Sequence, residues 1–295
     1  MIRIQLQIDL EYEVGEHGAD FIFNVHAAHT SSQVVSSESL RISQPVATQL
    51  LTDAESGNRH LRLRAEPGPL HLCYAATVDL THHRAVPEQL GEVRVADLPL
   101  EVLGYVYPSR YCQSDRLVKM AIDEFGALWQ GYGRVQAIQA WVQRHVSFRS
   151  NVSDSNTSAV DTLIERVGVC RDFAHLMIAL CRAVNIPARF ATGTDYGADP
   201  ALGPPDFHAY VEVYLGGRWY IFDPSDTAIP MGFVRLGTGR DAADVAFATI
   251  FGSVKSKAPM ISAVAVDDPS RGFMLPHACL EALSTDGADR GGVQP

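Results

Sequence analysis

The hydrophobic period changes once along the 295-residue chain, and that change limits the folds that the chain can adopt. From Ile2 to Leu10, apolar and polar residues alternate strictly, a period of two that is typical of a strand with one buried face. Further short apolar runs, separated by Gly, Pro, Ser and Asn, follow at residues 19–27, 39–44, 59–68 and 70–80. Short strands at this spacing favour an antiparallel sandwich over the first 100 or so residues.

Beyond the segment YPSRYCQSD (107–115), the period becomes helical. Two apolar stripes, separated at Gly131–Gly133, are formed by Leu117, Met120, Ala121, Phe125 and Leu128, and then by Val135, Ile138, Trp141, Val142 and Val146. Residues 155–168 offer Ser and Thr caps, a short helix and a stop at Gly168. The predicted fold class is therefore α+β, with strands first and helices packed on an antiparallel sheet later.

The segment GVCRDFAHLMIALCRAVNIPARFATG (168–193) places a cysteine at the front of an apolar helix. One helical face is formed by Phe173, Leu176, Met177, Leu180 and Val184. Asn185 and Pro187 are expected to end the helix before a strand that starts at Ala188. Cys170 then falls in the first turn, where free N–H groups and the helix dipole favour a thiolate. The alternative is a small buried residue, because position alone does not make a nucleophile.

The segment FHAYVEVYLGGRWYIFDPSD (207–226) predicts a β-hairpin around Gly216-Gly217. With a two-residue turn, Asp223 faces Tyr210, and His208 lies on the same face as Tyr210. His208 and Asp223 then become diagonal neighbours, about 7–8 Å apart between Cα atoms. A three-residue turn would break this register. The opposite face carries residues suited to a core, namely Ala209, Val211, Val213, Tyr220 and Phe222.

Together the helix and the hairpin supply the residues of a thiol-based catalytic site. Cys170 would attack a carbonyl as a thiolate, and its own backbone N–H would serve as an oxyanion donor. His208 would pair with the thiolate and protonate the leaving amine, while Asp223 would orient the imidazole. Each residue also has a structural interpretation: His208 as a half-exposed strand histidine, and Asp223 before Pro224 as a turn starter.

Composition excludes several classes of function. A formal charge of −10 argues against nucleic acid or an anionic membrane as the main partner. No run is long and apolar enough to span a membrane, and the start of the chain does not resemble a signal peptide. Five scattered cysteines without a CxxC pair favour reduced thiols, so we expect a cytoplasmic protein. No cofactor is implied, and no EF-hand loop is present.

Other candidate residues have simpler interpretations. Cys181 is expected in the core, too far along the helix from Cys170 for a disulfide. His175 is expected to be a packed or solvated helix histidine, since a zinc site would need two more ligands. The histidines at 71, 82 and 83 are expected on the surface of the β-rich part.

Three residues are possible supports of the site without belonging to it. Asp172 favours the start of the helix and is close enough in sequence to hydrogen-bond near the site. Gln113 and Tyr111 have the chemistry of a second oxyanion donor, but no pattern in the sequence places them near Cys170, and Cys112 beside them is expected to be incidental.

These motifs resemble the bacterial transglutaminase-like superfamily, whose members are often described as transglutaminase-like cysteine peptidases. The resemblance covers residues 107–226 and implies a papain-type core with Cys170 as nucleophile, His208 as base and Asp223 as acid. Residues 238–252 resemble the C-terminal continuation of the family, and the β-rich front resembles its N-terminal domain. Tyr210 departs from a common Trp, and the loop 192–206, expected to shape the substrate cleft, has no clear counterpart.

The sequence thus predicts a β-rich N-terminal domain (1–100), a transglutaminase-like catalytic domain (107–265) and a partly disordered tail (266–295). The expected function is hydrolysis of a peptide or isopeptide amide, with acyl transfer to an amine as a variant. Two alternatives remain open: a true amide-exchanging transglutaminase, and a non-catalytic module that binds peptides. The expected partner is a peptide or protein amide substrate, and the sequence does not specify an oligomeric state.

Overall fold

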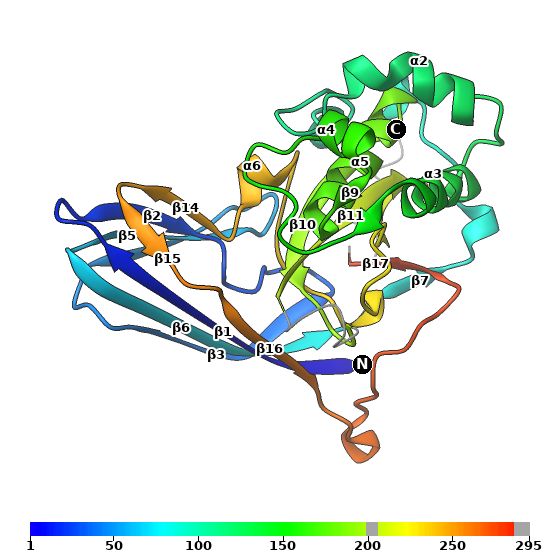
Figure 1. The fold of residues 1–295 in the computed structure, drawn as a ribbon. Coiled ribbons are helices and arrows are strands. Elements are labelled where there is room, and N and C mark those ends of the chain that lie inside the picture. Colours follow the sequence, from blue (N-terminus) through cyan, green and yellow to red (C-terminus); the bar gives the residue numbers. More distant parts are fainter. Residues whose placement is uncertain (199–205, 286–295) are drawn as a thin grey trace.

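The β-rich front of the chain is a sandwich of two antiparallel sheets, as expected (Figure 1). The computed structural model describes residues 1–198 and 206–285. The first sheet has the order β15-β1-β6-β3, with β16 also pairing with β1. Its strands are β1 (Ile2–Val14), β3 (Gln33–Ile42), β6 (Gly68–Leu80), β15 (Val254–Ser256) and β16 (Met260–Ala265). The second sheet has the order β14-β2-β5-β4, formed by β2 (Ala19–Phe23), β4 (Thr48–Thr52), β5 (Arg59–Ala65) and β14 (Ala248–Phe251).

The alternation of apolar and polar residues in β1 explains why one face of its sheet packs against the other sheet of the sandwich. Every second residue from Ile2 to Val14 is buried, and these side chains share a core with Phe21 and Phe23 of the facing sheet. The edge strand β4 has no such signal, because all five of its residues are exposed, and the sequence analysis does not identify it.

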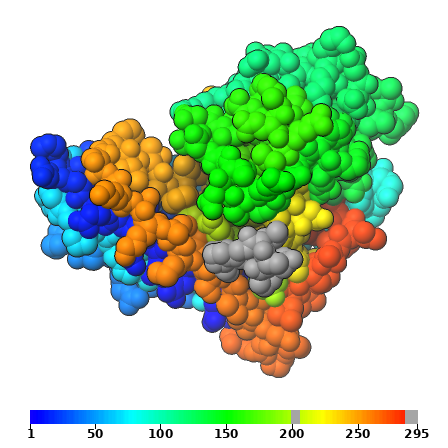
Figure 2. All heavy atoms as spheres, in the orientation of Figure 1, coloured from blue at the N-terminus to red at the C-terminus, as the bar shows by residue number. Residues whose placement is uncertain are grey.

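The sandwich also takes strands from late in the chain. Strands β15 and β16 pair with β1, so residues 254–265 lie on the N-terminal sheet although the sequence groups them with residues 107–265. Figure 2 shows residues near 250 beside the N-terminal residues, as these pairings require. Pairing between segments so far apart in the chain leaves no local pattern that could predict it.

The second half packs helices on a six-stranded sheet with the order β13-β10-β11-β12-β17-β7 (Figure 1). The strands are β7 (His83–Ala85), β10 (Ala188–Thr194), β11 (Phe207–Leu215), β12 (Arg218–Phe222), β13 (Val234–Gly239) and β17 (Ala282–Ser284). The helices are α1 (Leu100–Leu103), α2 (Ser114–Phe125), α3 (Tyr132–His145), α4 (Ala159–Glu165), α5 (Cys170–Ala183) and α6 (Ala242–Val245). A parallel pair joins β8 (Ser147–Phe148) to β9 (Val167–Gly168). No helix within the described ranges is long and apolar enough to cross a membrane.

Helix α5 lies at the centre of this half. It contacts α2, α3 and α4 on one side and the strands β10 and β11 on the other. All of its residues from Asp172 to Ala183 are buried, so burial extends around the helix beyond the single apolar face predicted from the sequence. Asn185, with φ 64°, follows the end of the helix, as expected.

The end of α4 differs from the prediction of a stop at Gly168. Arg166, with φ 57°, takes the left-handed conformation that closes α4, and it does so two residues earlier. Gly168 is required for a different reason. A Cβ at this position would lie 2.7 Å from the Cβ of Asp172, closer than side-chain carbons can approach.

The sheet face away from the helices rests on the sandwich. Residues of β10 to β13 on this face join the sandwich core, namely Ala191, Tyr210, Ile221, Val234 and Leu236. The C-terminal segment also reaches this sheet through β17, whose Ser284 pairs with Tyr220. Residues 286–295, the last part of the tail expected to be partly disordered, lie outside the described residues.

Two side-chain amides from the sandwich pair with β13, which is an edge strand. The amide of Gln33 accepts from the N–H of Arg235 at 2.8 Å and donates to its carbonyl at 2.9 Å. Asn58 does the same with Thr238, at 2.9 and 2.7 Å. Both amides satisfy the open edge of the sheet as a neighbouring strand would.

Candidate active site

Cys170 is the first residue of α5 and is half-buried. Its Sγ lies 3.9 Å from the carbonyl oxygen of Phe207, the residue before His208 on β11. The start of the helix therefore meets the start of the strand. Within residues 1–198 and 206–285, no acceptor takes the backbone N–H of Cys170, so this donor is available.

The hairpin of β11 and β12 has the predicted register. Leu215 pairs with Arg218, and Val211 pairs with Phe222. Gly216 and Gly217 have φ values of 55° and 89°, which a two-residue hairpin turn of this type requires and which glycine allows. The predicted core face is also confirmed, because Ala209, Val211, Val213, Tyr220 and Phe222 all pack in the core that contains α5.

His208 and Asp223 lie together on the other face, as the register predicts. The Nε2 of His208 is 3.2 Å from the Oδ2 of Asp223, and both side chains are only 3% exposed. The contact is an ion pair rather than an aligned hydrogen bond, since neither atom has a partner with good hydrogen-bond geometry.

Each residue of this pair stabilises the charged form of the other. Burial alone would lower the pKa of His208, but the carboxylate of Asp223 and a side-chain hydrogen bond with Cys170 outweigh burial and raise it well above its ordinary value. Burial would raise the pKa of Asp223, yet His208 and the hydrogen bonds from Ser225 hold it below its ordinary value. A charged imidazole facing an ionised carboxylate is therefore the favoured state.

Ser225 fixes the carboxylate of Asp223, a role that the sequence analysis does not identify. Its hydroxyl donates to Oδ1 at 2.7 Å and its N–H to the same atom at 3.1 Å. Oδ2 is left facing His208. The Asp-Pro-Ser turn is the signal that could have revealed it, because an aspartate that starts a turn accepts hydrogen bonds from residues just after it. Asp223 thus starts a turn and pairs with His208.

Asp172 is more closely tied to the site than its sequence position suggests. Its side chain is fully buried, and its Oδ2 accepts hydrogen bonds from the N–H of Val169 and the hydroxyl of Ser153. Its Oδ1 faces the guanidinium of Arg171 at 3.2 Å. The carboxylate therefore supports both sides of Cys170.

The two suggested oxyanion donors differ in placement. The hydroxyl of Tyr111 donates to the carbonyl of Ser155 at 2.6 Å, and its ring stacks on His175 at 5.0 Å between centroids. That hydroxyl is already engaged. Gln113 has a buried Oε1 without a partner, and neither residue hydrogen-bonds to Cys170 in the described ranges.

The remaining candidates on α5 are structural. Cys181 is fully buried in the core, as expected, and burial raises the pKa of its thiol. His175 is also fully buried, and its ring packs between Tyr111 and Phe190. Its Nε2 accepts from the N–H of Ala242 at 3.2 Å, and burial holds its pKa well below the ordinary value. It is a packed, neutral histidine.

The three histidines expected on the surface of the β-rich part do not gather with other ligands in the described residues. His71 pairs with Asp9 at 3.2 Å, and His83 is exposed. His82 is only partly on the surface, and burial lowers its pKa to about 4. No group of three metal-ligating side chains comes together anywhere in the described part of the chain.

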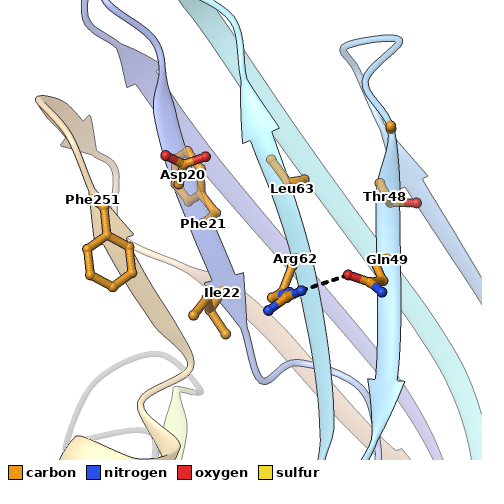
Figure 3. A pocket seen from close by; sticks show the side chains of 9 residues that line it. Asp20, Phe21, Ile22, Thr48, Gln49, Arg62, Leu63 and Phe251 are labelled. Atoms are coloured by element: carbon orange, nitrogen blue, oxygen red, sulfur yellow. Dashed lines mark hydrogen bonds between the residues drawn. The ribbon is translucent and has the colours of Figure 1, made fainter.

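Of two hollows on the surface, one adjoins the candidate site and the other does not. The larger, about 430 Å³, lies on the outer face of the sandwich and is lined by residues such as Ile22, Arg62 and Phe251, far in the fold from α5 (Figure 3). The smaller, about 370 Å³, is lined by Asp223, by the polar face of α3 and by residues 279–283. Only the second adjoins the candidate site, although it is the smaller one.

Comparison with known proteins matches both halves of the chain. Residues 124–224 match the family model of the transglutaminase-like superfamily, and residues 2–101 match the model of the bacterial transglutaminase N-terminal domain. A solved structure, "a Putative Cysteine Protease from Cytophaga hutchinsonii", is 41% identical over 96% of this chain and 97% of its own, with a TM-score of 0.87. The chain belongs to the transglutaminase-like superfamily.

Other relatives match over shorter segments. An uncharacterized protein of Mycobacterium leprae is 32% identical over 117 residues, which are 38% of this chain and 42% of the relative. An uncharacterized protein of Mycobacterium tuberculosis is 36% identical over 110 residues, or 34% of this chain and 35% of the relative. The chain thus matches less than half the length of these two relatives.

Membership in the transglutaminase-like superfamily and similarity to the Cytophaga hutchinsonii protein support a cysteine-dependent enzyme in general. The fold predicted from the resemblance is confirmed, including its N-terminal domain. Residues 199–205, in the second half of the loop expected to shape the substrate cleft, lie outside the described residues.

Proposed function

We propose that the protein is a thiol-dependent amide hydrolase that acts through Cys170, His208 and Asp223. The supporting observation is the position of His208. This buried imidazole pairs with Asp223 at 3.2 Å, and the carbonyl oxygen of Phe207, the residue just before it, lies 3.9 Å from the Sγ of Cys170 at the start of α5. A thiol, an imidazole and a carboxylate in this order form a nucleophile, a base and an orienting group.

Each residue has a defined step. The Cys170 thiolate attacks the amide carbon, and the backbone N–H of Cys170 donates to the oxyanion that develops. The His208 imidazolium protonates the amine as the C–N bond breaks, which leaves an acyl group on sulfur. His208 then takes a proton from water, the water attacks the acyl-enzyme, and the carboxylic acid departs as the thiolate is restored. Asp223 keeps Nε2 of His208 oriented throughout.

The acyl group on Cys170 could also be taken by an amine, which would make the protein an amide-exchanging transglutaminase. We propose hydrolysis as the main reaction, with a peptide or protein amide as the substrate. Within the described residues all five cysteines are free thiols, which favours a reducing compartment, and we propose the cytoplasm.

Turnover tests this proposal. The wild type would be incubated with a library of fluorogenic peptide amides, with and without a primary amine, and both the acid and the exchanged amide would be quantified by mass spectrometry. We expect Cys170→Ala to lose all turnover. Cys73→Ala is the matched control, because Cys73 is a free thiol in β6 of the sandwich, away from the candidate site, and its substitution should leave turnover unchanged. Full turnover in Cys170→Ala would refute the proposal, and ligand binding without turnover in both proteins would support a peptide-binding module instead.

A further inference from the structure

We propose that Asp172 is a positioning residue that holds the N–H of Cys170 and the first turn of α5 in place for attack on a carbonyl. The proposal rests on the function proposed above. Asp172 follows the nucleophile by two residues, and its carboxylate contacts Val169, Ser153 and Arg171 rather than the thiol, so it acts through the backbone around Cys170.

Asp172 closes a ring around Cys170. Its backbone N–H donates to the carbonyl of Val169 at 2.8 Å, and its Oδ2 accepts from the N–H of Val169 at 2.9 Å. Cys170 and Arg171 lie between these two bonds. The side chain is fully buried, and Gly168 has no Cβ that would prevent its approach. The orientation of the first turn is thus fixed from both directions.

The carboxylate also ties this turn to the neighbouring loop. The hydroxyl of Ser153 donates to Oδ2 of Asp172 at 2.5 Å. Arg171 spans the same loop, since its Nη2 donates to the hydroxyl of Ser153 at 3.0 Å and to the carbonyl of Asp154 at 2.8 Å. Ser153 is therefore bound to both Arg171 and Asp172, and Asp154 is bound to Arg171, so movement of the helix start would break several hydrogen bonds together.

Two neighbouring backbone N–H groups at the start of α5 differ in whether they have an acceptor. The N–H of Val169 is occupied by Asp172, whereas the N–H of Cys170 has no acceptor in the described residues. An oxyanion donor must be both free and fixed, because its contribution depends on reaching the oxygen without reorganisation. Asp172 supplies the fixed position and leaves the donor free.

A carboxylate in the first turn suits the helix dipole, but electrostatics alone would not favour it for the thiol chemistry of Cys170. A negative charge near a thiolate opposes its formation, and Arg171, at 3.2 Å from Oδ1, only partly offsets it. The benefit must therefore be geometric, and geometry predicts a selective defect when Asp172 is removed. Reactions that develop an oxyanion should suffer, while reactions that need only the thiolate should not.

Two reagents separate these cases. With p-nitrophenyl acetate, the sulfur of Cys170 bonds to the carbonyl carbon, an oxyanion forms and collapses, and the C–O bond breaks to release p-nitrophenolate. With chloroacetamide, the sulfur displaces chloride at a saturated carbon, and no oxyanion forms. Acetylation would be measured as the release of p-nitrophenolate that is lost in Cys170→Ala, because the acetyl group on sulfur can itself be hydrolysed. Alkylation would be measured at Cys170 by peptide mass spectrometry, and both rates would be taken on folded full-length protein at the same pH.

We expect Asp172→Ala to slow acetylation of Cys170 by about tenfold or more, since small misplacement of a catalytic group has effects of that order. Alkylation should change by less than about threefold. Ser153→Ala removes one of the hydrogen bonds and should give a smaller change in the same direction, which keeps the test available if Asp172→Ala does not fold.

Asp161→Ala is the matched control. Asp161 is the third residue of α4, as Asp172 is of α5, and its Oδ2 accepts from the N–H of Ser158 at 2.9 Å. Asp161 therefore makes the same kind of hydrogen bond in a helix that does not carry the thiol. Both rates should be unchanged in this variant. Equal slowing of acetylation and alkylation in Asp172→Ala, or no slowing of either, would overturn the positioning role. A wild type that is alkylated at Cys170 but releases p-nitrophenolate no faster than Cys170→Ala would instead refute the proposed function, and this inference with it.

Discussion

The Nε2 of His208 lies 3.2 Å from the Oδ2 of Asp223, with both side chains almost completely removed from solvent. Ser225 occupies the other carboxylate oxygen, so Asp223 has one orientation available toward the imidazole. Little solvent screens the two charges, and the protonation of His208 is consequently coupled to that of Asp223.

The first prediction concerns the titration of His208. Because its pKa is raised, the imidazolium should persist as the pH rises above about 6.5, the usual value for histidine, and should be lost only at higher pH. NMR of protein with ¹⁵N-labelled histidine would follow the ring. Asp223→Asn should move the midpoint downward, because burial then acts without the opposing charge. A wild-type midpoint at or below about 6.5 would contradict the ion pair.

Substitution of the same aspartate should slow turnover without abolishing it. Asp223→Asn keeps the shape of the side chain but no longer stabilises the charged imidazole or its orientation. We expect kcat to fall between about tenfold and ten-thousandfold, whereas His208→Ala should leave no measurable turnover. Steady-state kinetics on a substrate of the wild type would measure both. An Asp223→Asn variant with wild-type kcat would exclude an orienting role for Asp223.

A third prediction concerns the join between the sandwich and the catalytic sheet. Asn58→Ala should remove both hydrogen bonds to the backbone of Thr238 and lower the free energy of unfolding by about 1–3 kcal/mol, because buried polar groups lose their partners. Gln44→Ala is the control, since Gln44 also bonds to backbone groups but at an exposed position. Its cost should stay within about 0.5 kcal/mol. Urea denaturation would compare the two variants. Equal losses in the free energy of unfolding would show that the hydrogen bonds of Asn58 to Thr238 do not contribute to stability.

Gly168 gives a fourth prediction. A Cβ here would lie 2.7 Å from the Cβ of Asp172, so Gly168→Ala should displace Asp172 and destabilise the protein by about 1–3 kcal/mol through overpacking. Gly133→Ala provides the contrast. Gly133 lies within α3 with no atom near its missing Cβ, and alanine should stabilise that helix by about 0.5–1 kcal/mol. Thermal unfolding should shift in opposite directions for the two variants.

The sequence was sufficient for features set by local periodicity. The period-two run from Ile2 predicts β1, and the turn at Gly216-Gly217 fixes the pairing that brings His208 and Asp223 to one face. Once register is known, the side-chain alternation of strands leaves a single outcome. The placement of these two residues therefore follows from the sequence, while their chemical roles remain predictions.

Features set by contacts between distant segments could not be predicted in this way. The pairings of β15 and β16 with β1 join residues about 250 positions apart, and β4 carries no alternation because it is exposed on both faces. The support of Asp172 by Ser153 depends on how a loop folds back on α5. A local pattern contains no information about such tertiary contacts.

The identity of the nucleophile is tested most directly by mass spectrometry with an electrophilic peptide-like probe at pH 6–7. We predict that Cys170 is labelled faster than the other four cysteines, because it is half-buried at a helix start beside His208. Burial raises the pKa of Cys112 to about 12, which should leave that thiol inert. Labelling at Cys170 that disappears in Cys170→Ala, with the remaining sites unchanged, is the expected result. Faster labelling of Cys73 or Cys279 in the folded protein, with Cys170 unmodified, would contradict the assignment of Cys170 as the nucleophile.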